Sequence, residues 1–360
     1  MPGLDTRRLR LFLGGMSLAA QFYPLLKPLL FRLDPERAHE WTTKMMRISH
    51  SLGLLGSEAP SGIRPVNALG LTFPNVLGLA AGMDKSASCV DAWAAVGFGF
   101  VEVGTLTPRP QPGNPKPRLF RLPQHEALIN RMGFNNAGIH SAVARLKTRK
   151  TKAVVGVNIG KNFDTPNERA VDDYLACLRA AFPVADYIAV NISSPNTKGL
   201  RDLQEEDAIR RLVSSLKAEQ ATLQITHGRA VPVLVKIAPD LEEAQIEALA
   251  RVFNEQRIDG VIATNTTLSR VAVQGHPLAD QAGGLSGAPV TQRSTEVIRA
   301  FRRLLQPSIP LIGVGGILSG AHACEKLDAG AALIQVYSGL VYRGPKLVRD
   351  VLEATLQKGG

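Results

Sequence analysis

The chain has 360 residues, of which 45% are hydrophobic, 20% charged and only 5% aromatic. This balance is too apolar for a disordered chain and too polar for a polytopic membrane protein, and so few aromatic side chains argue against a stacking platform for single-stranded nucleic acid. The formal net charge of +11 attracts phosphates, anionic substrates or acidic lipids and does not choose among them.

The first segment, residues 1–21, is a basic and then apolar extension. Arg7, Arg8 and Arg10 precede an apolar run that is shorter than the ~20 residues needed to cross a bilayer. A cleaved signal peptide and a transmembrane helix both stay open for such a pattern. We expect instead an N-terminal extension that associates with a membrane.

Residues 22–60 have the pattern of a small helical domain. Apolar residues recur with helical spacing over 22–33, where Pro28 would dent the helix near its start. Asp34 and Pro35 then form an N-cap and first-turn signature, and Ala38, Trp41, Met45 and Ile48 share one face of a second helix. Such helices can lie on a membrane surface, or their apolar faces can pack on each other or on the main domain. Spacing alone favours packing.

The rest of the chain, residues 61–360, alternates between strand-like and helical segments. Eight apolar runs are separated by stretches of helical period, which is typical of parallel strands buried on both faces. The runs are 75–81, 98–104, 153–160, 187–192, 232–237, 260–265, 310–315 and 332–337. They predict an α/β fold, a (β/α)8 TIM barrel that follows the small N-terminal helical domain. An open doubly wound sheet is the alternative, but residues 78–82 lack its GxGxxG turn.

Polar residues follow most of these strands. They would lie at the carboxyl end of the barrel, where the active sites of TIM-barrel enzymes are found. The set is rich in Asn, Thr, Ser and Lys and poor in His and carboxylates. It contains no Ser-His-Asp arrangement and no acid pair for glycoside chemistry. The three cysteines, Cys89, Cys177 and Cys324, have no zinc-ligand spacing, so we expect reduced thiols and no metal. Amide and lysine groups suit a planar anionic ligand with several carbonyl and N–H edges.

A phosphate site is expected at the last two strand ends. Gly313, Gly315 and Gly316 allow backbone N–H groups to approach an anion, and Ser319 can begin a short helix behind them. In TIM-barrel enzymes the loops after strands seven and eight frequently form a phosphate-binding site. Two long insertions, 107–136 and 193–204, are candidates for a lid that excludes water.

Taken in order, the segments AAGMDK, NRMGFNN, NISSPNT, VKIAPD, ATNTT, GGLSG, GVGGI and VYSG closely resemble dihydroorotate dehydrogenases. The preceding YPLLKPLLFRLDPERAHEW is similar to the N-terminal helical domain of the quinone-dependent, membrane-associated class 2 enzymes. Ser194 within NISSPNT points the same way, because class 1 enzymes typically carry Cys there.

This resemblance implies an FMN flavoprotein that oxidises (S)-dihydroorotate to orotate in de novo pyrimidine (UMP) synthesis, with a quinone as electron acceptor. Ser194 would be the catalytic base that removes the C5 proton while a hydride passes from C6 to N5 of FMN. The substrate residues it implies are Lys85, Asn130, Arg131, Met132, Gly133, Phe134, Asn191, Asn196, Asn265 and Thr266. Those implied for FMN are Ala81, Gly82, Met83, Asp84, Lys85, Thr105, Asn158, Asn191, Lys236, Thr264, Gly287, Gly316, Tyr337 and Ser338.

The resemblance also sets expectations about partners. We expect one FMN per chain, a membrane quinone and a monomer held by its N-terminal helices, residues 22–60, on the cytoplasmic side of the inner or cell membrane. Nucleic acid is not expected as a partner. The rival functions are a soluble class 1 enzyme using fumarate or NAD, a tRNA-dihydrouridine synthase, which should carry an RNA-binding domain, and a non-catalytic phosphate-binding barrel.

Overall fold

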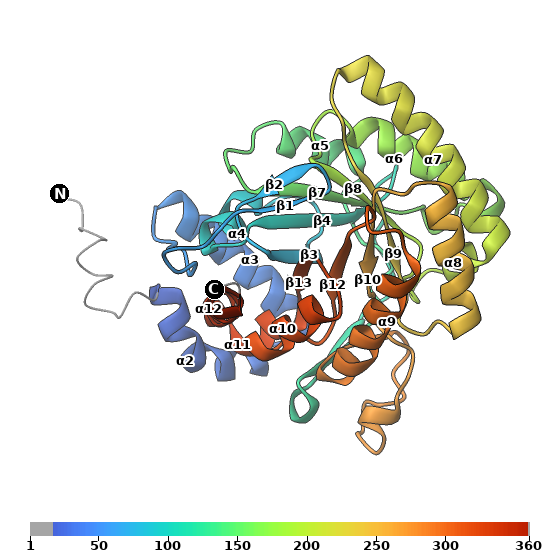
Figure 1. Cartoon of the computed structure of the whole chain (residues 1–360). Coiled ribbons are helices and arrows are strands. Elements are labelled where there is room, and N and C mark those ends of the chain that lie inside the picture. Colours follow the sequence, from blue (N-terminus) through green and yellow to red (C-terminus); the bar gives the residue numbers. More distant parts are fainter. Residues whose placement is uncertain (1–16, 359–360) are drawn as a thin grey trace.

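The computed structural model describes residues 17–358, and every structural statement below concerns that part of the chain. Its centre is a closed barrel of parallel strands, paired in chain order and closed by the last strand against the first (Figure 1). The strands are β3 (Leu77–Asp84), β4 (Phe100–Leu106), β7 (Val154–Ile159), β8 (Tyr187–Asn191), β9 (Val233–Ile237), β10 (Gly260–Ala263), β12 (Leu311–Val314) and β13 (Leu333–Val336). Each lies on one of the eight predicted runs, so the TIM barrel fold is confirmed.

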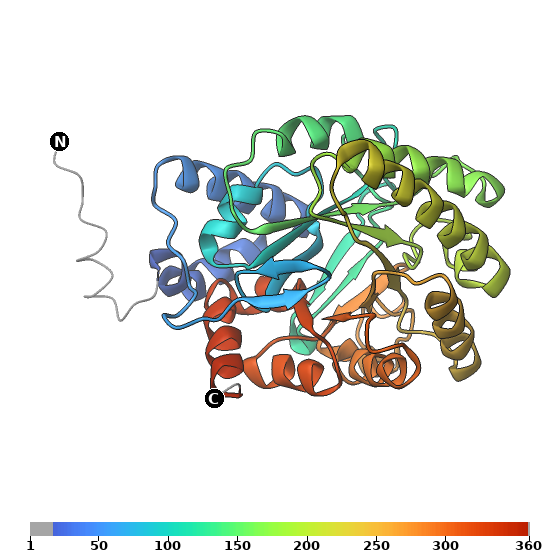
Figure 2. The same cartoon turned by 45° about the horizontal axis from the view of Figure 1, so that its top comes forward.

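Helices surround the barrel and cover the outer faces of its strands (Figure 2). They are α4 (Val90–Val96), α5 (Ile139–Leu146), α6 (Ala170–Ala181), α7 (Glu206–His227), α8 (Glu243–Glu255), α9 (Thr291–Leu304), α10 (Gly320–Asp328), α11 (Ser338–Arg343) and α12 (Lys346–Lys358). Short 3-10 turns occur at Pro123–His125, Asn167–Arg169, Leu200–Gln204, Val271–Val273 and Ala288–Val290. Because the strands are apolar on both faces, one core forms inside the barrel and a larger one between the strands and the helices.

Aromatic rings fill the barrel interior near the amino ends of its strands. Phe100 and Tyr187 point inward, and a Cβ on Gly78 or Gly156 would overlap their rings, so small and large residues alternate across the interior. A hairpin of β1 (Val66–Ala68) and β2 (Leu71–Phe73) crosses this end of the barrel (Figure 2). Its Phe73 ring lies 5.2 Å from that of Phe100. The hairpin therefore covers the amino end, and the polar cavity described below lies at the carboxyl end.

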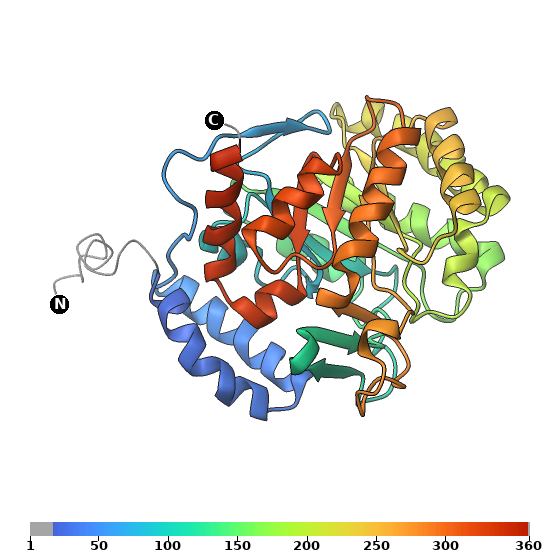
Figure 3. The ribbon, with the colours of Figure 1, turned by 60° about the horizontal axis from the view of Figure 1, so that its bottom comes forward.

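A small antiparallel sheet stands beside the carboxyl end of the barrel. It consists of β5 (Leu119–Leu122), β6 (Ala127–Asn130) and β11 (Gly284–Gly287), in the order β11-β6-β5 (Figure 3). The insertion 107–136 supplies the first two strands, and the third comes from a loop far along the chain. The sequence predicted a loop here and missed the sheet, because its central pairing joins Asn130 to Gly284, a partner that no local pattern indicates.

Two antiparallel helices, α2 (Leu18–Arg32) and α3 (Pro35–Ser51), pack against one side of the barrel near β5 and α11 (Figure 3). Asp34 caps α3 by accepting hydrogen bonds from the backbone N–H groups of Glu36 and Arg37, as the sequence predicted. Helix α2 continues through Pro28. Residues 1–16 of the expected membrane extension lie outside the described part of the chain, and none of the helices described is long and apolar enough to span a bilayer.

The apolar faces of these two helices are only partly covered. Leu25, Leu29 and Trp41 are 70%, 58% and 50% exposed. The helical spacing predicted that these apolar faces pack on each other or on the barrel, and this holds for part of their surface only. The two helices lie side by side and border a cavity.

Candidate active site

A polar cavity opens at the carboxyl ends of the barrel strands. Its walls come from the ends of β3, β4, β8, β9, β10, β12 and β13, from β6 and the loop after it, and from β11. It brings together the following predicted residues: Ala81, Gly82, Lys85, Thr105, Asn130, Met132, Gly133, Phe134, Asn191, Ser194, Asn196, Lys236, Thr264, Asn265, Thr266, Gly287, Gly316, Tyr337 and Ser338. Segments spread over most of the chain thus meet around one space.

Four predicted residues do not line this cavity. Met83 faces the N-terminal helices, and the Asp84 carboxylate accepts the backbone N–H groups of Ser88 and Cys89. The Arg131 guanidinium turns outward over the Phe120 ring. Asn158 lies beneath the cavity and accepts a hydrogen bond from the Thr105 hydroxyl at 2.6 Å. Direct ligand contact by these four stays a prediction, and in the structure their side chains have partners inside the protein or lie elsewhere.

Asparagine side chains form one half of the cavity. The Asn196 amide donates to Asn130 Oδ1 at 3.2 Å, and Asn265 Nδ2 donates to Ser193 Oγ at 3.0 Å and to Asn191 Oδ1 at 3.3 Å. Two buried oxygens on the cavity wall, Asn196 Oδ1 and Thr266 Oγ1, have no hydrogen-bond partner in the described chain. Buried polar atoms are nearly always paired, so these two fit a ligand that offers N–H groups or accepts a hydroxyl hydrogen.

Ser194 lies on the wall of this asparagine half and is 5% exposed. Its Oγ accepts the backbone N–H of Asn196 at 3.2 Å, which leaves its hydrogen free to point elsewhere. In the same loop the Thr197 hydroxyl is buried and unpartnered within the described residues. Both hydroxyls are buried, which limits their contact with bulk water.

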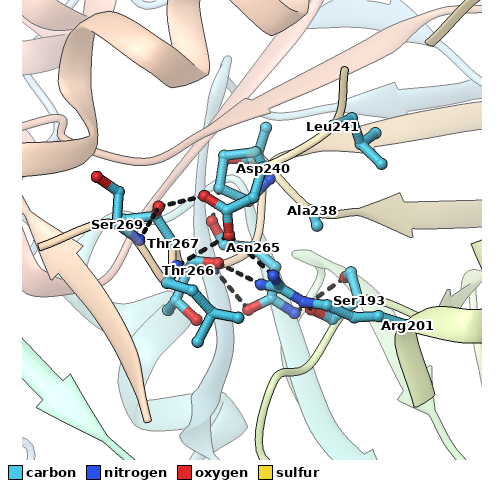
Figure 4. A network of polar contacts seen from close by, with 12 residues as sticks. Ser193, Arg201, Ala238, Asp240, Leu241, Asn265, Thr266, Thr267 and Ser269 are labelled. Atoms are coloured by element: carbon cyan, nitrogen blue, oxygen red, sulfur yellow. Dashed lines mark hydrogen bonds and ion pairs between the residues drawn. The ribbon is translucent and has the colours of Figure 1, made fainter. Parts of the chain in front are cut away.

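An arginine outside the predicted set fixes this loop (Figure 4). Arg201 donates to the carbonyl oxygens of Ser193 at 3.1 Å and Thr266 at 2.9 Å, and it pairs with Asp240 at 2.8 Å. Asp240 in turn accepts the backbone N–H of Leu268 at 2.8 Å. The loop that carries Ser194 is therefore tied to the loop after β10. Sequence reasoning missed Arg201, because a basic residue in a loop carries no local sign of its partners.

Lys85 follows β3 and closes the end of the cavity nearest α3. Burial is the largest influence on this ammonium group and lowers its pKa to about 8, although the nearby Glu36 carboxylate acts in the opposite direction. An anion that binds beside this lysine favours the charged form of the ammonium group and opposes the effect of burial. This cavity end is thus suited to a carboxylate.

The other half of the cavity has the form of a phosphate cradle. The carbonyl oxygens of Gly315 and Gly316 accept hydrogen bonds from the Ser294 and Thr291 hydroxyls, each at 2.9 Å. In a trans peptide the N–H group points opposite to the carbonyl, so the N–H groups of Gly316 and Ile317 face the cavity. Gly316 has φ +70°, and a Cβ there would collide with Thr291. The residues present therefore fit the anion site that the sequence predicted.

A buried lysine supports this cradle from behind. Lys326 is 0% exposed, and its Nζ donates to the Thr291 carbonyl at 2.6 Å and to the Ser294 hydroxyl at 2.5 Å. Burial lowers its pKa to about 7. Sequence reasoning missed this residue, since a lysine in a helix is ordinarily on its solvated face.

A buried carboxylate lies under the centre of the cavity. Glu102, on β4, is 0% exposed and stands 3.7 Å from Lys236 Nζ. It accepts hydrogen bonds from Asn158 at 2.8 Å, Tyr187 at 2.9 Å and Gln335 at 2.8 Å. This network holds Lys236 against the cavity floor. A glutamate inside an otherwise apolar strand was a signal for it that the sequence analysis did not use.

A second, apolar cavity of about 350 Å³ lies between α2, α3 and the barrel. Its walls include Leu26, Leu30, Met45 and Trp93, with few polar groups, among them His39 and Arg121. Burial is the main cause that lowers the pKa of His39 to about 3, with Lys85 adding to it, so this imidazole is neutral near pH 7. Tyr337 lines both cavities, so its side chain lies between the polar and the apolar site.

A closed parallel barrel whose carboxyl end holds a phosphate cradle, an amide-rich pocket and a buried lysine is a (β/α)8 barrel enzyme site. The family model described as dihydroorotate dehydrogenase matches residues 65–358. The chain belongs to the dihydroorotate dehydrogenase family, and within it to the quinone-dependent class 2 enzymes.

Its relatives cover almost its whole length. The "Dihydroorotate dehydrogenase (quinone)" of Chromobacterium violaceum is 60% identical over 336 residues, which is 93% of this chain and 98% of the relative. The protein of the same name from Stenotrophomonas maltophilia is 58% identical and covers 92% of this chain and 95% of its own. The ligand-free crystal structure of the Eimeria tenella enzyme superimposes with a TM-score of 0.83 at 38% identity, over 91% of this chain and 96% of that one.

Proposed function

We propose that this chain oxidises (S)-dihydroorotate to orotate, with one FMN as its cofactor and a membrane quinone as its electron acceptor, in de novo pyrimidine synthesis. The observation that carries the proposal is the pairing of a polar cavity and an apolar cavity across Tyr337. A polar substrate and an apolar electron acceptor can then be bound at the same time, on opposite sides of one redox group.

FMN fits the cradle half of the polar cavity. The N–H groups of Gly316 and Ile317, with Ser338 and Gly287 beside them, would hold its phosphate. Thr105, Lys236 and Thr264 line the floor on which its ring would lie. When bound, FMN would accept the hydride from C6 of the substrate. Lys236 would place a positive charge beside the ring, and Glu102 keeps that lysine in position.

Dihydroorotate fits the asparagine half. Lys85 would pair with its carboxylate, and Asn130, Asn191, Asn196 and Asn265 would hold its carbonyl and N–H groups. Ser194 would remove the C5 proton. A serine is a weak base by itself, so the proton would have to leave along a hydrogen-bonded path. The unpartnered Thr197 hydroxyl in the same loop would begin this path, taking up the proton as it passes its own hydrogen onward to solvent.

The quinone fits the apolar cavity between the two N-terminal helices. We propose that residues 22–60 act as a docking domain that places this cavity on the cytoplasmic surface of the membrane. Leu25, Leu29 and Trp41 are exposed, and the same helices carry the exposed cations Arg32 and Arg47. Apolar insertion and attraction to acidic lipids would then act together, as in peripheral amphipathic helices.

An anaerobic titration tests the function directly. Purified protein carrying FMN should lose its flavin absorbance on addition of dihydroorotate and regain it on addition of a ubiquinone or menaquinone analogue. A protein that dihydroorotate does not bleach would refute the proposed substrate. Reoxidation by fumarate or NAD in preference to quinones would refute the proposed acceptor.

A further inference from the structure

A buried ion pair joins helix α3 to the insertion that carries the substrate-site residues. Arg118, just before β5, and Glu36, in the first turn of α3, are each 6% exposed. Their side chains form a two-pronged contact, with Arg118 Nη2 donating to Glu36 Oε1 at 2.7 Å and Arg118 Nε donating to Oε2 at 3.1 Å. Such a fork fixes the plane of the guanidinium as well as its position.

The remaining edge of the same guanidinium holds a turn of the insertion. Arg118 Nη1 donates to the carbonyl oxygens of Pro112 at 2.6 Å and Asn114 at 2.8 Å. A Cβ on Gly113, between them, would lie 2.8 Å from that nitrogen, so the turn is closed tightly around it. Glu36 thereby orients the group on which the turn is built.

The tip of this turn bridges the two segments that form the asparagine half of the cavity. Asn114 Nδ2 donates to the carbonyl oxygen of Arg131 at 2.9 Å and to that of Asn196 at 3.2 Å. The Asn114 backbone N–H donates to the Met132 carbonyl at 3.1 Å. One side chain thus sets the spacing between the loop 130–134 and the loop that carries Ser194.

We propose that Glu36 and Arg118 are positioning residues for dihydroorotate: through them α3, the helix that borders the apolar cavity, sets the geometry of the substrate pocket. The inference rests on the proposed function and goes beyond it, because the N-terminal helices then serve both half-reactions. Helix α3 contributes Ala38, Thr42 and Met45 to the wall of the apolar cavity, and Glu36, two residues before Ala38, faces the insertion.

The physical consequence of losing Glu36 is specific. Without the carboxylate the guanidinium keeps its charge but loses its fork, so it can rotate towards other acceptors and release the carbonyl oxygens of Pro112 and Asn114. The Asn114 bridge then loosens, and the asparagine pocket widens although no residue that touches substrate is replaced. Coupling between two sites typically changes affinity by about 5- to 150-fold, so we expect roughly a tenfold effect.

The test compares Glu36→Gln with Glu40→Gln in the holoenzyme. Glu40 is a matched control because it lies one turn further along α3 and is exposed, 3.9 Å from Lys116. Glu36→Gln should raise the dihydroorotate concentration for half-maximal flavin reduction, and the orotate dissociation constant read from flavin absorbance, by about tenfold. The quinone KM should stay at the wild-type value, and hydrogen exchange of residues 112–134 should quicken. Glu40→Gln should change none of these.

Other outcomes would overturn the inference. If Glu36→Gln behaves like Glu40→Gln while dihydroorotate bleaches the wild-type flavin, the ion pair has no positioning role, although the proposed function stands. If dihydroorotate and quinone constants rise together with a lowered Tm, the pair is only structural. Should Glu36→Gln fail to fold, Asn114→Ala removes the bridge without exposing a buried charge, and unchanged orotate affinity in that variant would be equally decisive against the proposal. A wild-type flavin that dihydroorotate does not bleach contradicts the proposed function instead.

Discussion

Replacing Ser194 by Ala is the sharpest test of the proposed chemistry. The Ser194 hydroxyl has one hydrogen bond, from the Asn196 backbone N–H at 3.2 Å, while Arg201 holds the loop through the carbonyl oxygens of Ser193 and Thr266. The loop should therefore keep its shape in the variant. A general base contributes about 10²- to 10⁴-fold to a rate, which corresponds to about 3–5 kcal/mol of activation free energy.

The assay is anaerobic stopped-flow mixing of the holoenzyme with dihydroorotate, followed by flavin absorbance. The rate of flavin reduction in Ser194→Ala should fall by about 10²- to 10⁴-fold, while orotate affinity and FMN content stay near wild type. Ser193→Ala is the matched control, because that hydroxyl faces Asn191 and Asn265 instead, and it should weaken substrate binding more than it slows the reaction. Near-normal flavin reduction in Ser194→Ala would remove Ser194 from the role of base.

Three further predictions follow from the two cavities. Burial lowers the pKa of Lys85 to about 8, so this lysine is charged below that pH and loses its charge above it. Orotate affinity should therefore fall as pH rises above 8, by at most about tenfold per pH unit. A binding titration from pH 7 to 9.5 checks this, and an equally steep fall in Lys85→Met would contradict it. Gly316→Ala places a Cβ against Thr291 at φ +70°, so the purified variant should contain less FMN than the wild type. The ratio of flavin to protein absorbance measures this. A wild-type ratio would show that the FMN phosphate binds elsewhere. Thr42→Phe fills part of the apolar cavity and should raise the quinone KM by about tenfold. The rate of flavin reduction by dihydroorotate should stay unchanged. Unaltered quinone kinetics would argue against this cavity as the quinone site.

Proximity of the two cavities explains why one chain can serve two chemically unlike substrates. Tyr337 belongs to both walls, and its hydroxyl stays protonated because burial raises its pKa to about 12. It therefore separates the sites without adding charge between them. His39, which also lines the apolar cavity, is neutral for the same reason, since burial disfavours its charged form. An uncharged quinone meets no unpaired imidazolium there.

Local sequence patterns predict the barrel, and they place many of the residues that line the polar cavity at strand ends. Strands buried on both faces are uniformly apolar, and the helices between them have a clear period, so both are visible in local windows. Polar residues at strand ends must then converge, because parallel strands in a closed barrel all end on one rim. For this reason the order of the strands along the chain was enough to place Ser194, Lys85, Asn191 and Asn265 around one cavity.

The contacts that support this cavity arise from packing between distant segments. The sheet partner of Asn130 is Gly284, and the partner of Arg118 is Glu36. Neither contact produces a periodic pattern in the sequence. A strand pairing or an ion pair between distant segments depends on how irregular loops meet in space. Burial likewise made Lys326 an internal support, although a lysine in a surface helix is ordinarily solvated. Local patterns fix where elements lie along the chain, whereas the pairing and burial of single polar groups arise only when those elements pack together.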